Sequence, residues 1–209
     1  IVSVTIPSSV KTIGTSAFSG CTNLEKVTLN EGLVSIGEYS FKNTKITSVY
    51  IPATLTSVIG NHYAGPFEEC ASLNNVTFGE GITNIPVQLF YGCTGITKIT
   101  IPDTIKTIGN RAFQGCPNLT EIEIPSNVQS IGESAFDYCT HLESIPLLDT
   151  SKVESFYGTF NDTNLKTIPP INTESATSMR DMFSGCQNLV SIPLLSTDNV
   201  SNMNGMFRG

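Results

Sequence analysis

Apolar side chains recur along this chain with a period of about 23 residues. Phenylalanine marks the period most clearly, because nine of the eleven phenylalanines belong to one series with gaps of 23 to 26 residues. The series is Phe18, Phe41, Phe67, Phe90, Phe113, Phe136, Phe160, Phe183 and Phe207. A fixed period of this length is typical of a solenoid, in which each repeat forms one coil.

Each repeat predicts a short strand followed by a turn. Each repeat contains an apolar triplet such as Leu24, Val27 and Leu29. Its last three positions, 27–29, alternate apolar, polar and apolar residues, which is the periodicity of a strand. A second apolar pair follows, for example Ile105 and Ile108, and the next Ala-Phe segment favours a single helical or 3₁₀ turn. A helix this short is not stable alone. No repeat can bury its own apolar face, so we expect the coils to stack with like side chains in contact.

The predicted fold is therefore an α/β solenoid of about nine 23-residue units, with a parallel β-sheet and short helical or 3₁₀ turns. We expect one continuous array over residues 1–209, with an Ile-Pro/Ala-Phe type of repeat in 1–144 and a Met-Phe type in 145–209. Both ends of the sequence fall inside a repeat, and we therefore expect the sequence to be a fragment of a longer chain.

The units after residue 144 differ from the others by a proline inside the triplet. Leu142, Ile145 and Leu147 keep the triplet spacing, which places all three in the predicted core, but Pro146 stands among them. Proline cannot donate to a strand ladder, so we expect the sheet to thin or end on this side.

Composition and charge exclude several classes of function. The chain has a net charge of −7 and a pI near 4.7, and its eleven Lys and Arg residues are scattered. No basic surface for nucleic acid is expected. The sequence has no run of 18 apolar residues, so we predict no transmembrane segment in it.

No catalytic residue, metal site or cofactor is predicted. The chain has two His, and it lacks a Gly-x-Ser-x-Gly elbow, a phosphate loop and paired carboxylates on one element. Cys70, Cys93, Cys116 and Cys139 are spaced 23 apart. Stacked coils would hold their Cβ vectors parallel, which favours buried free thiols over disulfides. One His beside one of these Cys does not make a zinc site.

The repeat resembles a known family. The unit Ile-Pro-x-x-Val-x-x-Ile-Gly-x-x-Ala-Phe-x-Gly-Cys-x-Asn-Leu, seen best at 6–24 and 101–119, resembles the BspA-like class of leucine-rich repeats. The last three units resemble related Thr-x-x-Val-x-x-Met-x-x-Met-Phe repeats of lipoproteins and surface proteins. The resemblance implies an extracellular or envelope-anchored cell-surface protein, and several members of the class are regarded as adhesins. The second and seventh units depart from the pattern by losing the Cys, and the third carries a four-residue insertion.

Outward positions of the predicted sheet are the candidate binding site. Two positions flank the central apolar residue of each strand and point away from the core. The candidates are Lys26, Thr28, Ser48, Tyr50, Asn75, Thr77, Lys98, Thr100, Glu121 and Glu123. A flat array of hydroxyls, mixed charges and one aromatic ring suits broad contacts with a protein or glycan, and a merely soluble sheet face is the alternative. The insertion adds His62 and Tyr63, since loops often carry function, although insertions in solenoids are frequently neutral.

We therefore predict a non-enzymatic cell-surface protein that binds a protein or glycan partner. Its most concrete form, implied by the resemblance, is adhesion to a host extracellular-matrix or cell-surface partner. The alternative is a structural spacer or stalk that presents a distal domain and has no ligand of its own.

Overall fold

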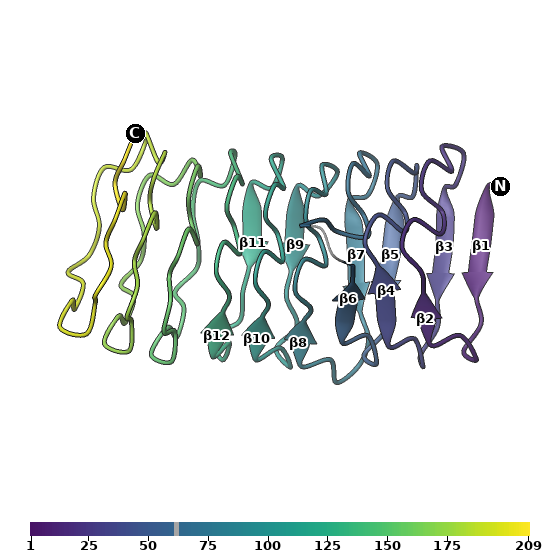
Figure 1. Ribbon diagram of the computed structural model, residues 1–209, viewed down its shortest axis with the longest axis horizontal. Helices are drawn as coiled ribbons and strands as arrows, with labels where there is room; N and C mark the ends of the chain where they lie inside the picture. Colours follow the sequence, from purple (N-terminus) through teal and green to yellow (C-terminus); the bar gives the residue numbers. More distant parts are fainter. Residues whose placement is uncertain (61–62) are drawn as a thin grey trace.

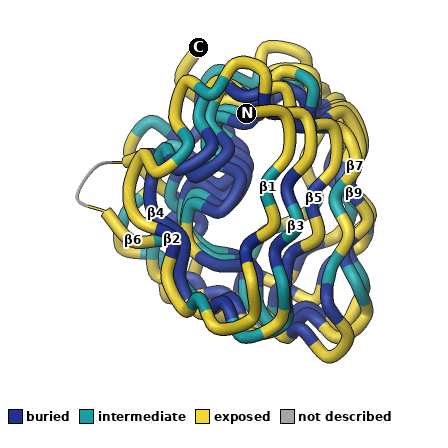
Figure 2. Tube along the Cα trace, turned by 90° about the vertical axis from the view of Figure 1, so that its right-hand side faces the viewer, coloured by how far each residue is buried: buried dark blue, intermediate teal, exposed yellow. Residues whose placement is uncertain are grey.

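The structure is a computed structural model that describes residues 1–60 and 63–209. It is a parallel-strand β-solenoid, whose coils follow one another along one axis with the two termini at opposite ends (Figure 1). Within the described residues, six coils carry two strands each. The two sets of strands lie on opposite sides of the coil, and buried residues line its interior (Figure 2).

The first strand of each coil lies on one side of the stack. These strands are β1 (Ser3–Ile6), β3 (Lys26–Leu29), β5 (Ser48–Ile51), β7 (Asn75–Phe78), β9 (Lys98–Thr100) and β11 (Glu121–Glu123). They pair in parallel as β1 with β3, β5 with β7 and β9 with β11. The register sets Val4 beside Val27, and Ile99 beside Ile122. Equivalent residues of successive repeats are therefore neighbours.

The second strand of each coil is shorter and lies on the opposite side. These strands are β2 (Thr12–Ile13), β4 (Ser35–Gly37), β6 (Ser57–Ile59), β8 (Asn84–Ile85), β10 (Thr107–Ile108) and β12 (Ser130–Ile131). They form two three-stranded parallel sheets, in the orders β2, β4, β6 and β8, β10, β12. The break between the two sheets falls at the coil that carries the insertion.

Stacked phenylalanine rings run through the interior. Successive ring centroids are 5.1 to 6.1 Å apart, and neighbouring rings are at most 23° from parallel. All rings from Phe41 to Phe183 are buried, whereas Phe207 in the last coil is 55% exposed. The apolar cluster built on this stack extends from Ile6 to Met206. Each coil therefore buries its apolar side chains against the coils on either side.

The predicted helical turns are wrong, and with them the α/β class, because no helix forms in the part of the chain that the structure describes. Residues two before and two after the phenylalanine adopt positive φ, as at Ser16 (58°) and Gly20 (71°). A left-handed residue interrupts a helix within one turn. Backbone amides here bond to the next coil instead, and the amide of Phe18 donates to the carbonyl of Ser40 at 2.7 Å.

The prediction of nine regular units is also wrong, since the solenoid has about six regular turns. Beyond Ile131 the described chain contains no strand, and only isolated bridges such as Ser155 with Ser178 remain. The phenylalanine stack nevertheless continues to Phe207. The sheet thus ends near the first internal proline, and ring stacking carries the core further.

Side-chain spacing explains why the strands stop. In regular coils the last two core residues are two apart, as in Ile122 and Ile124, whereas Ile145 and Leu148 are three apart. Leu147, which we predicted to be in the core, is 63% exposed because Leu148 takes the interior position. A spacing of three does not match the two-residue period of a strand.

Buried cysteines link neighbouring coils by hydrogen bonds, and their burial as free thiols confirms the prediction. The Cys116 thiol donates to the Phe90 carbonyl at 3.1 Å, and the Cys139 thiol donates to the Phe113 carbonyl at 3.2 Å. Burial raises the pKa of the Cys139 thiol well above its usual range. All six cysteines are free. In the seventh unit Thr163 takes the cysteine position, and its hydroxyl donates to the Phe160 carbonyl at 2.8 Å.

Candidate ligand-binding face

The outward side chains of the odd-numbered strands β1 to β11 form one surface, which we call the strand face. Nine of the ten residues predicted there are exposed, and Thr28 is half-buried. The central residues of the strands, such as Val49 and Ile99, are buried. This alternation follows from the pleat, which sends successive side chains to opposite sides. The ten residues thus share a surface, and their role in binding stays a prediction.

Five of the ten predicted residues line one shallow hollow on the strand face, with a volume of about 450 Å³. These residues are Thr28, Ser48, Tyr50, Asn75 and Thr77. Val27, Leu29 and Val49 also line it, together with Asn30 and Glu31, which follow β3. We call this hollow the Tyr50 hollow. It spans β3, β5 and β7, so three successive coils contribute to it.

Tyr50 is held in place by a carboxylate of the preceding coil. Its phenol O–H donates to Oε1 of Glu31 at 2.6 Å, and the same oxygen accepts the amide of Ala53 at 3.1 Å. The bond to Glu31 raises the pKa of Tyr50 to about 12, and the bond from Tyr50 lowers the pKa of Glu31. Tyr50 is nevertheless 37% exposed. The ring is therefore fixed at one end and open to solvent.

Glycine in the following coil leaves room for this pair. A Cβ atom at Gly79 would lie 2.9 Å from the Tyr50 hydroxyl and 2.7 Å from Oε1 of Glu31. Both distances are shorter than ordinary van der Waals contacts, so a larger residue at Gly79 would displace the pair.

Three side chains of the hollow present polar groups that are left for a ligand. Among the residues that the structure describes, the side chains of Ser48, Asn75 and Thr77 form no hydrogen bond. Hydroxyl and amide groups of this kind both donate and accept. They are therefore available to a ligand, unlike the carboxylate of Glu31.

The predicted residues on β9 and β11 form a separate charged group. The Lys98 ammonium lies 2.9 Å from Glu121 Oε1 and 2.9 Å from Glu123 Oε1, and the Thr100 hydroxyl donates to Glu123 Oε2 at 2.6 Å. The bonds to Thr100 and Lys98 lower the pKa of Glu123, and bonds to Glu123 and Glu121 raise the pKa of Lys98. Exposed ion pairs of this kind contribute little stability. Lys26, on β3, is exposed and belongs to neither group.

The structure does not bring Tyr63, the described one of the two predicted insertion residues, to the strand face. Tyr63 follows β6, which lies on the side opposite the odd-numbered strands β1, β3, β5, β7 and β9 (Figure 2). Tyr63 is 70% exposed, and the Arg111 guanidinium carbon lies 4.4 Å from its ring centroid. His62 lies outside the described residues.

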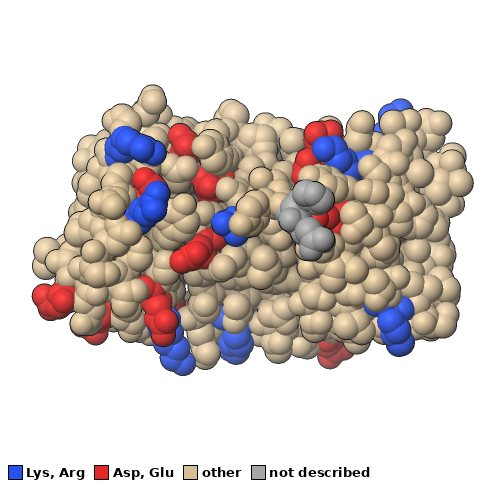
Figure 3. Space-filling view, viewed as in Figure 1, with Lys and Arg blue, Asp and Glu red and all other residues tan. Residues whose placement is uncertain are grey.

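The face of the molecule seen in Figure 3 carries side chains of both signs of charge over its length. In the described ranges 1–60 and 63–209, no group of three or more His, Cys, Asp or Glu residues is placed to hold a metal ion. The same ranges contain no helix with the length and apolar character needed to cross a bilayer.

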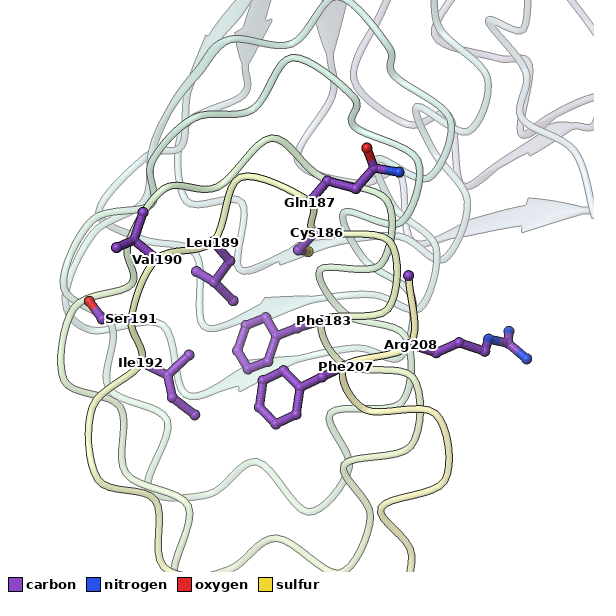
Figure 4. Close-up of a pocket in the computed structure, with 10 residues that line it drawn as sticks. Phe183, Cys186, Gln187, Leu189, Val190, Ser191, Ile192, Phe207 and Arg208 are labelled. Atoms are coloured by element: carbon purple, nitrogen blue, oxygen red, sulfur yellow. The ribbon is translucent and has the colours of Figure 1, made fainter.

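Another hollow, of about 350 Å³, lies at the last coil (Figure 4). Phe183, Leu189, Ile192 and Phe207 line it. The corresponding side chains of inner coils, such as Phe136, are covered by the next coil. This hollow is therefore the uncovered end of the stack, and we assign no ligand to it.

Sequence reasoning missed Asn30 and Glu31. Both lie just after the alternating positions of β3, at a corner where the repeat predicts only a turn. The missed contact is diagonal, because Tyr50 reaches back across one coil to Glu31. A comparison of equivalent positions in successive repeats cannot show such a contact. The available signal was Tyr50 itself, which stands at an outward position where neighbouring repeats have threonine.

Comparison with known proteins agrees with the architecture. A family model described as BspA type leucine rich repeat region matches residues 1–66 and 59–190, in six copies. No curated protein matches the chain.

Solved structures show the same fold. A leucine-rich repeat protein from Bacteroides ovatus ATCC 8483 is 21% identical, with a TM-score of 0.64, over 98% of this chain and 60% of its own. The T. pallidum leucine rich repeat protein is 31% identical, with a TM-score of 0.54, over 68% of this chain and 64% of its own. A leucine-rich repeat protein from Eubacterium ventriosum ATCC 27560 is 20% identical, with a TM-score of 0.52, over 100% of this chain and 76% of its own.

The chain spans less than two thirds of the length of the first two proteins, at 60% and 64%. The family model, in contrast, covers most of this chain, and its description agrees with the repeat unit read from the sequence. This chain belongs to the BspA-type leucine-rich repeat family.

Proposed function

We propose that this chain is a non-enzymatic interaction module of a cell-surface protein, and that it binds a protein or glycan through the strand face. The observation that carries the proposal is the Tyr50 hollow, where five outward residues of three coils converge and three of them have side chains with no hydrogen-bond partner among the described residues. An extracellular location and adhesion to host matrix or host cells rest on the family resemblance.

The proposal of a non-enzymatic role rests on the family and on the hydrogen bonds and ion pairs that engage the carboxylates of the strand face. Glu31 is occupied by Tyr50, and Glu123 is occupied by Lys98 and Thr100. Carboxylates held in this way have lowered pKa values, whereas a general acid or base works best with a pKa near the operating pH.

A structural spacer remains the second candidate, and the continuous core favours it. The apolar cluster runs without interruption from Ile6 to Met206, so the stack is a stiff body. A spacer needs only this stiffness, and the composition of its strand face would be free to vary.

A triple variant separates the two candidates. Tyr50→Ala, Thr77→Ala and Lys98→Ala together remove the ring, one hydroxyl and the charge at the centre of the strand face. We expect the variant to lose binding to immobilised matrix proteins, glycans or host cells that the unmodified chain binds. Retention of that binding by the triple variant would contradict binding through the strand face, and no binding by the unmodified chain would favour the spacer.

The matched control carries the same kinds of change away from the strand face. Tyr138→Asn, Thr107→Ala and Lys152→Ala alter three exposed residues. Asn is chosen at Tyr138 because this residue has a φ of 58°, which Asn tolerates. The control is expected to bind as well as the unmodified chain.

A further inference from the structure

We propose that the Tyr50 hollow is a binding site for a neutral saccharide. One face of the Tyr50 ring would pack against the C–H groups of a sugar ring, and Ser48, Asn75 and Thr77 would hydrogen-bond its hydroxyls. The inference rests on the proposed function, and it names the ligand class for one part of the strand face.

The aromatic part of the site is already in place. Tyr50 is anchored by its bond to Glu31, which engages only the hydroxyl, and the residue is 37% exposed. Tyrosine supplies a large, rigid contact area with only two side-chain torsions to fix. Because the anchor has fixed them before binding, a ligand loses little affinity to ordering the side chain.

The polar part of the site matches the chemistry of a sugar. Each hydroxyl of a pyranose both donates and accepts hydrogen bonds, and so do the side chains of Ser48, Asn75 and Thr77. These three lie on β5 and β7, in the coil of Tyr50 and the coil after it. They therefore surround the ring on one side with groups whose hydrogen-bonding capacity is unused.

Charge selects for a neutral sugar over an acidic one. No Lys or Arg is among the described residues that line the hollow, and its one carboxylate belongs to Glu31. A sulfated or carboxylated sugar would meet this negative charge with no cation in the described lining of the hollow to offset it.

Size and shape also favour a saccharide over a protein. A volume of about 450 Å³ lies within the range of small-molecule sites. A stable protein interface requires about 800 Å² on each partner, usually around a buried apolar anchor. The rim of this hollow is polar and it spans three coils, which suits one or two sugar units.

The test is an NMR titration of the whole ¹⁵N-labelled chain. The probes are glucose, galactose, mannose, N-acetylglucosamine and disaccharides built from them. Binding at the hollow is expected to shift amide signals of residues 27–31, 48–50 and 75–77, and to leave those of β9 and β11 in place.

Variants locate the site. Tyr50→Ala is expected to weaken saccharide binding at least about tenfold, which corresponds to roughly 1.4 kcal/mol, in the upper range for a contact with an aromatic ring. Asn75→Ala is expected to weaken it several-fold, and Tyr50→Phe should fall between Tyr50→Ala and the unmodified chain because it keeps the ring without its anchor. Tyr138→Asn removes an exposed tyrosine outside the strand face and is the matched control. Circular dichroism and Tm verify that each variant is folded.

The outcomes separate this inference from the proposed function. If saccharides bind equally well to Tyr50→Ala and Asn75→Ala, or if none binds at tens of millimolar, the hollow is not a saccharide site. The proposed function would still stand if the triple variant lost binding to a matrix protein. It would fail if the triple variant bound every partner like the unmodified chain.

Discussion

Phe113 represents the residues that hold the stack together. Its ring lies between those of Phe90 and Phe136, with centroid distances of 5.4 and 5.7 Å. Phe113→Ala would open a cavity between two rings, and we expect it to lower the free energy of unfolding by about 3 to 5 kcal/mol. Thr100→Ala, on the strand face, should change it by no more than about 0.5 kcal/mol. Urea titrations of both variants measure the difference, and equal effects would mean that inside and outside had been assigned wrongly.

Asp137 makes stability depend on pH. It is buried, and its carboxylate accepts hydrogen bonds from the Gln114 amide at 2.6 Å and from the Asn161 amide at 2.7 Å. Burial raises its pKa to about 6, above the value of the unfolded chain. Its contribution to stability is therefore fully present below about pH 4 and is lost as pH rises through about 6.

Asp137→Asn should remove this dependence. The Gln114 carbonyl oxygen has no partner among the described residues, so a flip of the Gln114 amide would let it accept from the new side chain. We expect the stability of the variant relative to the unmodified chain to rise between pH 4.5 and pH 7.5. Denaturant titrations at both pH values test this, and a difference that stays constant would contradict it.

At the scale of elements, the two halves of the stack differ in how many amides are protected. The amides of β3 and β11 lie in paired strands, whereas the amides of Leu147, Leu148 and Ile171 have no backbone partner among the described residues. We expect these three to exchange with solvent much faster than amides of the paired strands. Hydrogen exchange followed by NMR measures this, and uniform protection along the chain would contradict the end of the sheet near residue 131.

The first strand of each coil could be predicted from the sequence, but the second strand and the turns could not. Apolar and polar residues alternate around Val27 and Ile99, and this pattern predicts a strand with one side in the core. The turns depend on positive φ at residues such as Tyr39 and Arg111, which no glycine signals. Bonds to the next coil support this conformation, as where the Arg111 amide donates to the Glu133 carbonyl at 2.9 Å. A local pattern cannot show a partner that lies one coil away.

The candidate site was predictable to a similar extent. The outward rows followed from alternation, so all ten residues reached one surface. The sequence did not show that these residues divide into the Tyr50 hollow and the ion pairs of Lys98. That division depends on the directions in which long side chains reach from one coil to the next. Leu147 shows the same limit in the core, because the choice between it and Leu148 depends on the path of the chain around Pro146.

At the scale of the whole molecule, the strand pairs and ring contacts of the described residues join each coil to its neighbours. Stability in such a stack is approximately a sum of coil and interface contributions. We expect a chain shortened to residues 1–144 to remain folded, with a urea m-value lower by roughly a third, since m follows the surface exposed on unfolding. Circular dichroism during urea titration tests this. Loss of all structure in the shortened chain would show that cooperativity extends through the stack.

The 23-residue register also has an evolutionary consequence. Successive coils offer their neighbours equivalent carbonyls and equivalent rings, and several add an equivalent thiol, so an inserted copy would meet partners that it already fits. Unequal recombination between repeats can therefore lengthen or shorten the gene without creating an incompatible junction. Each such event would bring a different pair of outward residues side by side, and new recognition surfaces would arise by shuffling as well as by point mutation.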